Sequence, residues 1–536
     1  MDHHRKFPAS TGIWAVGIFV GLTFVYVANG GILPGNDATG NVHLALRVMD
    51  AGRVSFSPGD APTMFVWGTP TGGQLRTQPR DMDEIVDGTT AREQYRGGAI
   101  RVIKPKYYMT PTVRTNAATG EMLYVNTFGV GAALSAIPIL ATVQLITGDL
   151  HRAPATMWYA AKLSAALYVA ASAVLVFLIS KRLTTHRRAL GLALAYGLGT
   201  CVWSTSSQSL WQHAPNEFFL AVGMYSFLCL DSPRWRYFAA WAAGAAFGAA
   251  TVCRPTSVIF SVIVAAYLAA RERRAILLYI AGAAPFAAGL AVYHTYYLGA
   301  PWRTGQSVGG GAIALAKTGR SAVFQTPIWE GLGGLLISPS RGLLIFSPFL
   351  IATIAGVWIA WKNPALVRLR VLGVAALVSV ILESLHFDWW GGWSYGYRHI
   401  VDLTVIFTVL IAPAMDAICA NAVRAAGFGV LVIWSVAVQF VGAFAYDLYG
   451  WNGLVRYTFE APDGRRLEAL GDSDAKALAD RGAKLVEKIP LDIDRPENRK
   501  RLWSLEDSEI AYYIEHFNES RAIKAKIVSQ MFRSGD

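Results

Sequence analysis

The sequence YVNTFGVGAALSAIPILATVQLITG, at residues 124–148, decides how the rest of this chain is threaded. It is apolar enough to cross a lipid bilayer, and another long apolar run follows it at 158–180. If the segment 124–148 crosses, every later connection between apolar runs changes side. Its placement therefore determines which loops can share one face of a membrane.

The composition indicates a polytopic helical membrane protein. Of 536 residues, 53% are hydrophobic and 16% are charged, whereas a soluble domain carries roughly a quarter charged residues. The mean hydropathy is +0.35. We expect an all-α protein with about eleven transmembrane helices, because apolar runs of about 20 residues recur along the chain. The predicted spans are 12–32, 158–180, 189–205, 216–231, 237–253, 256–270, 275–293, 343–361, 369–386, 400–418 and 425–446.

The basic residues between these spans distinguish two faces. With the N-terminus taken as cytoplasmic and 124–148 as interfacial, one face receives fifteen Lys and Arg residues, from Arg5 to Arg424. The short connections on the other face hold only Arg254 and Arg398. Lys and Arg accumulate in cytoplasmic loops. The count thus predicts a cytoplasmic N-terminus, a 124–148 segment that lies along the outer interface or re-enters, and an extracytoplasmic C-terminus.

Three larger pieces would then lie on the outer face. Within a membrane domain at 1–446, these are a first loop at 33–157 with juxtamembrane helices and a mobile, glycine-containing loop at 294–342. The third is a charged tail at 447–536. Helical spacing in its segments SDAKALADRGAKLVEKI and SLEDSEIAYYIEHFNESRAIKAKIVSQMF predicts a small extracytoplasmic domain.

Several classes of function are disfavoured. The net charge of +12 is scattered between spans and does not form a basic patch, so no nucleic-acid partner is expected. The four Cys residues show neither disulfide nor metal-ligand spacing. The sequence contains no P-loop and no HExxH motif, which disfavours a nucleotide-driven pump or a soluble hydrolase of the HExxH type.

One acidic residue, Asp37, follows the first predicted span directly. It comes after Pro34-Gly35-Asn36, so it suits a turn or a helix cap. The alternative is a carboxylate at the mouth of a membrane cavity, acting as general base on an acceptor hydroxyl. The residue type and its position leave both interpretations open.

Arg254, Arg341 and Arg398 each lie at a predicted span end on the face where arginine is scarce. Such residues can extend to lipid headgroups. A guanidinium can also bind phosphate through two parallel hydrogen bonds. Together with His213 and His399, these residues could form a site for a lipid-linked phosphate.

The stretch DWWGGWSYGYRH at 388–399 concentrates rings beside that arginine. An aromatic belt at the membrane interface is one interpretation. The other is a sugar-binding surface, because aromatic faces pack on sugar C–H groups and glycine permits close approach. The candidate residues for sugar or acceptor binding are Trp390, Trp393, Tyr395, Tyr397, His213, Glu217 and His399. Glu217 could equally pair with an arginine or contact a cation.

In order and shared face, these motifs resemble the GT-C superfamily of integral-membrane glycosyltransferases. The nearest resemblance is to bacterial enzymes related to the protein O-mannosyltransferases and the lipid A aminoarabinose transferase. Four motifs over residues 12–446 carry it: Asp37 past the first span, YVNTFGVGAALSAIP, SPSRGLLIFSP and WWGGWSYGYRHI. Each motif is short, so the resemblance rests on their combination.

The resemblance implies inverting sugar transfer from a polyprenyl-phosphate donor to a lipid, glycan or protein acceptor at the outer face of a bacterial cytoplasmic membrane. Asp37 would be the base, and Arg341 and Arg398, with Arg254, would hold the donor phosphate. No metal ligand set is predicted and no obligatory cofactor is expected, with a divalent cation left as an open alternative. The chain departs from the pattern in lacking a second carboxylate beside Asp37 and a Lys-Pro-Pro before the interfacial helix. The alternatives are a flippase for lipid-linked saccharides and a non-catalytic subunit of a cell-envelope complex.

Overall fold

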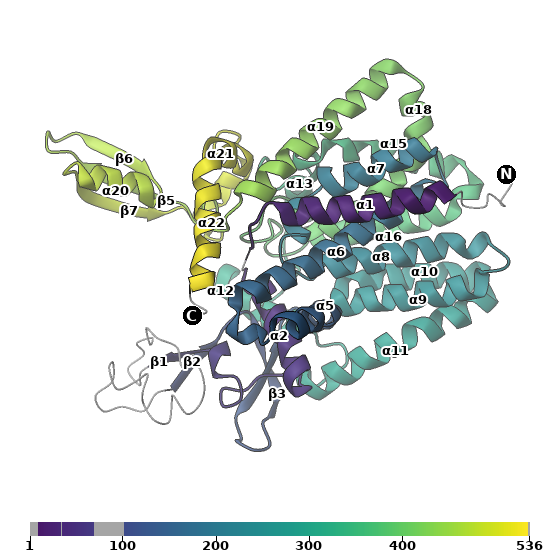
Figure 1. Ribbon diagram of the computed structural model, residues 1–536, viewed down its shortest axis with the longest axis horizontal. Coiled ribbons are helices and arrows are strands. Elements are labelled where there is room, and N and C mark those ends of the chain that lie inside the picture. The colour runs from purple at the N-terminus through teal and green to yellow at the C-terminus, as the bar shows by residue number, and fades with distance from the viewer. Residues whose placement is uncertain (1–8, 34, 69–100, 534–536) are drawn as a thin grey trace.

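The computed structural model describes residues 9–33, 35–68 and 101–533, and it shows a bundle of helices that run back and forth, with small sheets near one end (Figure 1). Arg5 and Lys6 lie outside the described residues. The main bundle helices are α1 (Ala9–Ala28), α6 (Pro154–Ser180), α7 (His186–Gly199), α8 (His213–Leu228), α9 (Arg236–Cys253), α10 (Val258–Arg271), α11 (Arg273–Leu298), α15 (Ala352–Lys362), α16 (Val367–Ser384), α17 (Thr404–Ile411) and α19 (Ala422–Ala445).

Within the described residues, six helices are long and apolar enough to cross a membrane. They are Thr11–Ala28, Pro154–Ser180, Arg273–Leu298, Pro364–Ser384, Arg398–Cys419 and Ala422–Ala445. Shorter apolar helices accompany them, for example Pro255–Arg271 and Pro348–Lys362. The structure thus agrees with a helical membrane protein, while the predicted number of about eleven spans stays a prediction.

One end of the bundle, which we call the basic end, gathers basic residues from several helix termini. Arg368, at the start of α16, pairs with Asp231 after α8 and with Glu272 between α10 and α11, the latter at 2.8 Å. Arg188, at the start of α7, pairs with Asp416 in α18 (Met415–Cys419). These connections, predicted to be cytoplasmic, therefore meet at one end of the molecule.

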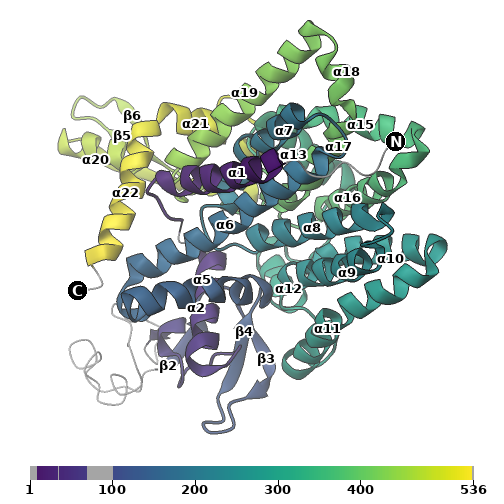
Figure 2. The ribbon, with the colours of Figure 1, turned by 45° about the vertical axis from the view of Figure 1, so that its right-hand side comes forward.

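The first loop builds part of the opposite end, beside the C-terminal elements (Figure 2). Its helix α5 starts against the last residues of α9, because a side chain at Gly131 would meet the backbone of Cys253. The far end of α5 leads through η2 (Leu150–Arg152) into the first turn of α6. α5 thus connects the end of α9 with the start of α6 and packs along α6, where Tyr168 donates to the carbonyl of Ser135. The elements here are α2 (Asn36–Ala51), β1 (Phe65–Gly68), β2 (Arg101–Pro105), β3 (Met109–Thr115), β4 (Met122–Asn126) and α5 (Gly131–Thr147).

The strands are a difference from the all-α prediction. β1 pairs with β2 and β3 pairs with β4, both antiparallel. In β3 the buried positions Met109, Thr110 and Thr112 hold the pair against its surroundings. The polar, Thr-rich composition of this strand gave no apolar alternation, which is why it was expected to be loop.

The predicted mobile loop 294–342 is largely helical instead, with α12 (Gly305–Thr318) and α13 (Ile328–Ile337) followed by α14 (Leu343–Phe346). Thr304 and Ser307 form a capping box at the start of α12. A side chain at Gly309 would collide with the hydroxyl of Thr110 in β3. The glycine run therefore allows α12 to pack closely on the sheet, a role that sequence alone does not distinguish from a flexible linker.

The tail predicted at 447–536 has two parts. A three-stranded sheet of order β6-β5-β7, with α20 (Asp472–Asp480), projects from the bundle (Figure 1). The following segment packs on α19 through α21 (Glu509–Glu515) and α22 (Phe517–Arg533), as helical spacing predicted. The helix predicted at 473–489 ends after α20, because Gly482 adopts φ 83° and a strand follows. The strands are β5 (Val455–Glu460), β6 (Arg466–Leu470) and β7 (Lys484–Pro490).

The contact between α9 and α11 depends on glycine, and this gives a stability prediction. A side chain at Gly282 would meet the carbonyl oxygen of Trp241, whereas one at Gly289, on the same helix, meets nothing within 4 Å. We expect Gly282→Val to destabilise the protein by about 1–3 kcal/mol through overpacking, seen as a lower Tm in detergent. Gly289→Val controls for the helix propensity of valine. Equal Tm changes in the two variants would contradict this account.

Candidate active site

The carboxylate of Asp37 forms an ion pair with the guanidinium of Arg398 at the end of the bundle opposite the basic end. The two residues are 361 positions apart in the chain. Asp37 lies in the first turn of α2, whose N-cap is Gly35, so it is not itself the cap. Both side chains stay partly accessible, at 12% for Asp37 and 14% for Arg398. An acid and a cation thus meet where they can be reached from outside.

The ring of Trp211 supports this pair. The Arg398 guanidinium carbon lies 4.1 Å from the centre of that ring, which is a close cation–π contact. Trp211 is itself buried. A side chain at Gly35 would collide with the same ring, so glycine is needed where α2 begins. The tryptophan therefore fixes both the start of α2 and the plane of the arginine.

A chain of polar contacts leads from Arg398 into the bundle. Arg398 Nε donates to His213 Nε2 at 3.4 Å, and His213 Nδ1 lies 3.0 Å from Asp402 Oδ1. Since a guanidinium only donates, His213 Nε2 accepts and Nδ1–H donates to Asp402. Arg254 contacts Asp402 on its other side. The neutral tautomer of a buried histidine thus connects two arginines through one carboxylate.

The same chain continues to the loop at 386–399. Arg254 pairs with Glu383 at 2.9 Å, and Glu383 lies 3.2 Å from His399 Nδ1. His399 Nε2 and His386 Nδ1 both face Asp388 Oδ1, at 3.4 and 2.5 Å. Burial alone would raise the pKa of Asp388, but the two histidines outweigh it and hold that pKa well below its usual value. Of the predicted residues, the structure brings together Asp37, Arg398, His213, Arg254 and His399.

Tyr108 is influenced by the charges of this site but was not predicted. Burial raises the pKa of its hydroxyl to about 12, with further contributions from the negative charges of Asp37, Asp494 and Asp388. Tyr108 has φ 53°, a backbone conformation that non-glycine residues rarely adopt and that often occurs at functional sites. Its sequence context, RVIKPKYY, contains no signal for such a role. Only the fold brings this hydroxyl close enough for the acids of the site to raise its pKa, an effect that the charge of Arg398 opposes.

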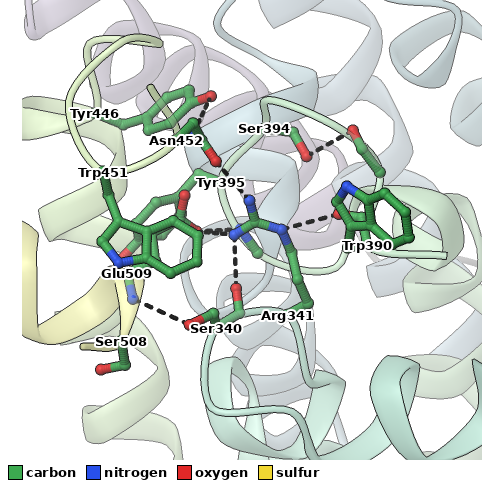
Figure 3. Close-up of polar contacts among 12 residues, drawn as sticks. Ser340, Arg341, Trp390, Ser394, Tyr395, Tyr446, Trp451, Asn452, Ser508 and Glu509 are labelled. Atoms are coloured by element: carbon green, nitrogen blue, oxygen red, sulfur yellow. Dashed lines mark hydrogen bonds and ion pairs between the residues drawn. The ribbon is translucent and has the colours of Figure 1, made fainter. Parts of the chain in front are cut away.

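Arg341 occupies a different place (Figure 3). It is fully buried and pairs with Glu509 of α21 at 2.5 Å. Its remaining N–H groups donate to the carbonyls of Ser340, Trp390 and Gly392 and to the side chain of Asn452. Burial raises the pKa of Glu509 to about 7, and the arginine opposes that rise. With every donor used inside the protein, Arg341 anchors the tail to the bundle and does not join Asp37.

The rings of the 388–399 stretch also face protein. Trp390 and Trp393 donate to Asp494 and Asp492 of the tail, at 3.1 and 3.0 Å. Tyr395 donates to the carbonyl of Val438 in α19, and Tyr397 shares a hydrogen bond with Ser347. These four side chains pack the loop against the tail and the bundle, and the structure does not place them beside Asp37.

The glycines of that stretch and Glu217 have local explanations as well. Gly391, Gly392 and Gly396 have φ of 78°, 62° and 68°, so they shape the loop backbone. Glu217 is buried in α8, where Ser206 donates to it at 2.6 Å and Tyr196 at 3.3 Å. In the sequence, these glycines and Glu217 are equally compatible with sugar contacts. Only the contacts in the structure distinguish a structural role from a sugar-binding one.

The arrangement offers a proton acceptor in Asp37, a cation in Arg398 that can bind an anion, and imidazole and phenol groups nearby. Such a set is suited to moving a group from a phosphate to a hydroxyl, because it can bind charge and accept a proton at one place. No protein-family model matches this chain, and no curated protein matches its sequence.

Proposed function

We propose that this protein is a membrane glycosyltransferase that moves a sugar from a polyprenyl-phosphate donor to an acceptor hydroxyl. The observation that carries the proposal is the accessible ion pair of Asp37 and Arg398 at one end of an apolar helix bundle. A donor with a lipid tail and a charged headgroup requires such a boundary, where apolar helices meet fixed polar groups. The resemblance of the sequence motifs to GT-C glycosyltransferases points to the same chemistry.

Among the three candidate arginines, Arg398 is the one suited to hold the donor phosphate. Its bonds to His213 and to the Gly391 carbonyl are long, at 3.4 and 3.5 Å, and its side chain is 14% exposed. Arg254 is buried between two carboxylates, and Arg341 has every donor engaged. A phosphate can therefore displace the Asp37 carboxylate from the guanidinium of Arg398. The freed carboxylate can then act on the acceptor hydroxyl.

In the reaction, the acceptor oxygen attacks the anomeric carbon while the bond from that carbon to the phosphate oxygen breaks. The departing phosphate keeps the bonding electrons, and Arg398 stabilises its added negative charge. Asp37 takes the proton that the acceptor hydroxyl loses. A single displacement of this kind inverts the configuration at the anomeric carbon. The balance needs neither a nucleotide nor a redox partner.

The proposed orientation places the site on the outer, periplasmic face of a bacterial cytoplasmic membrane. Its support is the separation of the two ends of the bundle, since lysine and arginine accumulate in cytoplasmic loops. Arg188, Arg236 and Arg368 lie at the basic end, and the Asp37–Arg398 pair lies at the other. The N-terminus then faces the cytoplasm, and the tail lies outside.

The test uses purified full-length protein in detergent with a polyprenyl-phosphate sugar radiolabelled in the sugar, and a pool of lipid, glycan and peptide acceptors. We expect label to leave the lipid-linked fraction and to appear in one acceptor class. The same protein in sealed vesicles that carry the labelled lipid in one leaflet tests a flippase. Movement of label between leaflets without any transfer would refute the glycosyltransferase proposal.

A further inference from the structure

Three side chains of the outer loop converge on one point that the proposed transfer does not use. The ligand-type atoms of His386, Asp388 and His399 all lie within 4.8 Å of one another. Asp388 Oδ1 lies between the two histidines, and no hydrogen bond satisfies it although it is buried. A carboxylate oxygen that faces two imidazole nitrogens without a hydrogen bond can be compensated by a positive charge, either on the imidazoles or on an ion bound between them.

The contact of the other ring nitrogen of His399, Nδ1, favours a metal ion as the source of this charge. Its Nδ1 lies 3.2 Å from Glu383, and Glu383 is itself held by Arg254 at 2.9 Å. If Nδ1–H donates to Glu383, the lone pair of Nε2 points at Asp388. A histidine whose far nitrogen donates to a carboxylate is the usual arrangement around a protein-bound metal. The second layer of a metal site is therefore present in addition to its ligands.

We propose that His386 Nδ1, Asp388 Oδ1 and His399 Nε2 form a divalent transition-metal site, with zinc as the ion it fits best. Two imidazoles and one carboxylate are a ligand set of catalytic zinc sites, which keep a fourth position for water or substrate. Zinc bonds of about 2.0–2.2 Å place tetrahedral ligands about 3.3 Å apart. The observed separations of 2.5 and 3.4 Å reach that geometry after a small movement of His386.

The site is reachable and lies beside the proposed transfer centre. The three side chains are 20%, 16% and 15% exposed for His386, Asp388 and His399, so an ion can enter and its fourth position can face solvent. His399 is the chain neighbour of Arg398. Metal binding itself does not depend on the proposed sugar transfer, and its readout is separate.

The experiment measures bound metal and not activity. Full-length protein is stripped with a chelator, dialysed against Zn²⁺, and analysed by mass spectrometry for zinc per chain. We expect about one zinc for the wild type and loss of that zinc in His386→Ala and in Asp388→Asn. His151→Ala removes an exposed histidine elsewhere and should keep the ion. Co²⁺ in place of Zn²⁺ should give the visible absorption bands of a tetrahedral site in the wild type and in His151→Ala alone.

A further variant tests the outer contact. Glu383→Gln should weaken zinc binding by roughly 10–100-fold without abolishing it, because it removes the carboxylate that orients His399. Asp388→Asn changes a single atom and leaves the loop packing intact. It therefore tests metal binding even if the His386→Ala variant fails to fold. Wild-type protein that binds no zinc, or variants that bind as much as the wild type, would overturn the proposal and would leave the glycosyltransferase assay unaffected.

Discussion

Replacing Asp37 by asparagine should lower the rate of sugar transfer by about 10²–10⁴-fold, the usual contribution of a general base. The amide keeps the size of the side chain and can still accept a hydrogen bond from Arg398, so the start of α2 should stay folded. It cannot take a proton from the acceptor hydroxyl. We therefore expect kcat to fall while KM for the lipid donor changes little.

The matched control is Asp50→Asn on the same helix. Asp50 is 40% exposed and contacts His151 away from the site. It should transfer sugar at the wild-type rate and unfold at the wild-type temperature. If Asp37→Asn folds normally and keeps full activity, Asp37 is not the base. If Asp50→Asn loses as much activity as Asp37→Asn, the effect of the latter comes from α2 as a whole.

The second large effect is expected on stability. Arg341→Gln should destabilise the protein by about 3–5 kcal/mol, because it leaves the buried carboxylate of Glu509 without its counter-charge. Both side chains are 0% exposed, so solvent cannot compensate for the loss. The variant should show a markedly lower Tm in detergent and faster proteolysis of the tail. Adding Glu509→Gln to it should recover part of the lost stability, since no uncompensated charge then remains.

Arg398→Gln is the matching variant, and it separates phosphate binding from a structural role, which the sequence alone does not distinguish. Its longer bonds and partial exposure predict a smaller loss of Tm than in Arg341→Gln, together with a strong loss of transfer. Donor affinity should fall as well, because the phosphate loses its cation. The opposite pattern, with Arg341→Gln stable but inactive and Arg398→Gln unstable but active, would reverse the assignment.

The sequence was sufficient to predict a mostly helical membrane protein and to group some of the polar residues that meet at one end of the bundle. Hydropathy identifies membrane helices because the bilayer leaves few alternatives to them. Residues at the ends of successive spans on one face come close together once the helices pack. That is why Asp37, Arg254 and Arg398 could be grouped before their contacts were known.

The rest of the site could not be predicted, because the role of each side chain depends on contacts with residues far away in the sequence. An arginine at a span end looks the same whether it faces a phosphate or, as Arg341 does, an acid 168 residues later. The rings of 388–399 have the composition of a sugar platform, yet their N–H and O–H groups are used by the tail and by α19. Tyr108 lies in the bend between β2 and β3, two strands that the sequence did not predict, and the effect of the acids on it is a product of tertiary packing.

The Arg341–Glu509 pair also has a consequence for how the protein is made. Because translation is sequential, Arg341 is synthesised before Glu509, which follows 168 residues later. Until α21 packs against the bundle, the guanidinium of Arg341 lacks the Glu509 carboxylate as its counter-ion. The nascent bundle then remains a substrate for quality-control proteases. Chains released early at the level of the tail should therefore be cleared from cells, even though every candidate membrane span is already complete.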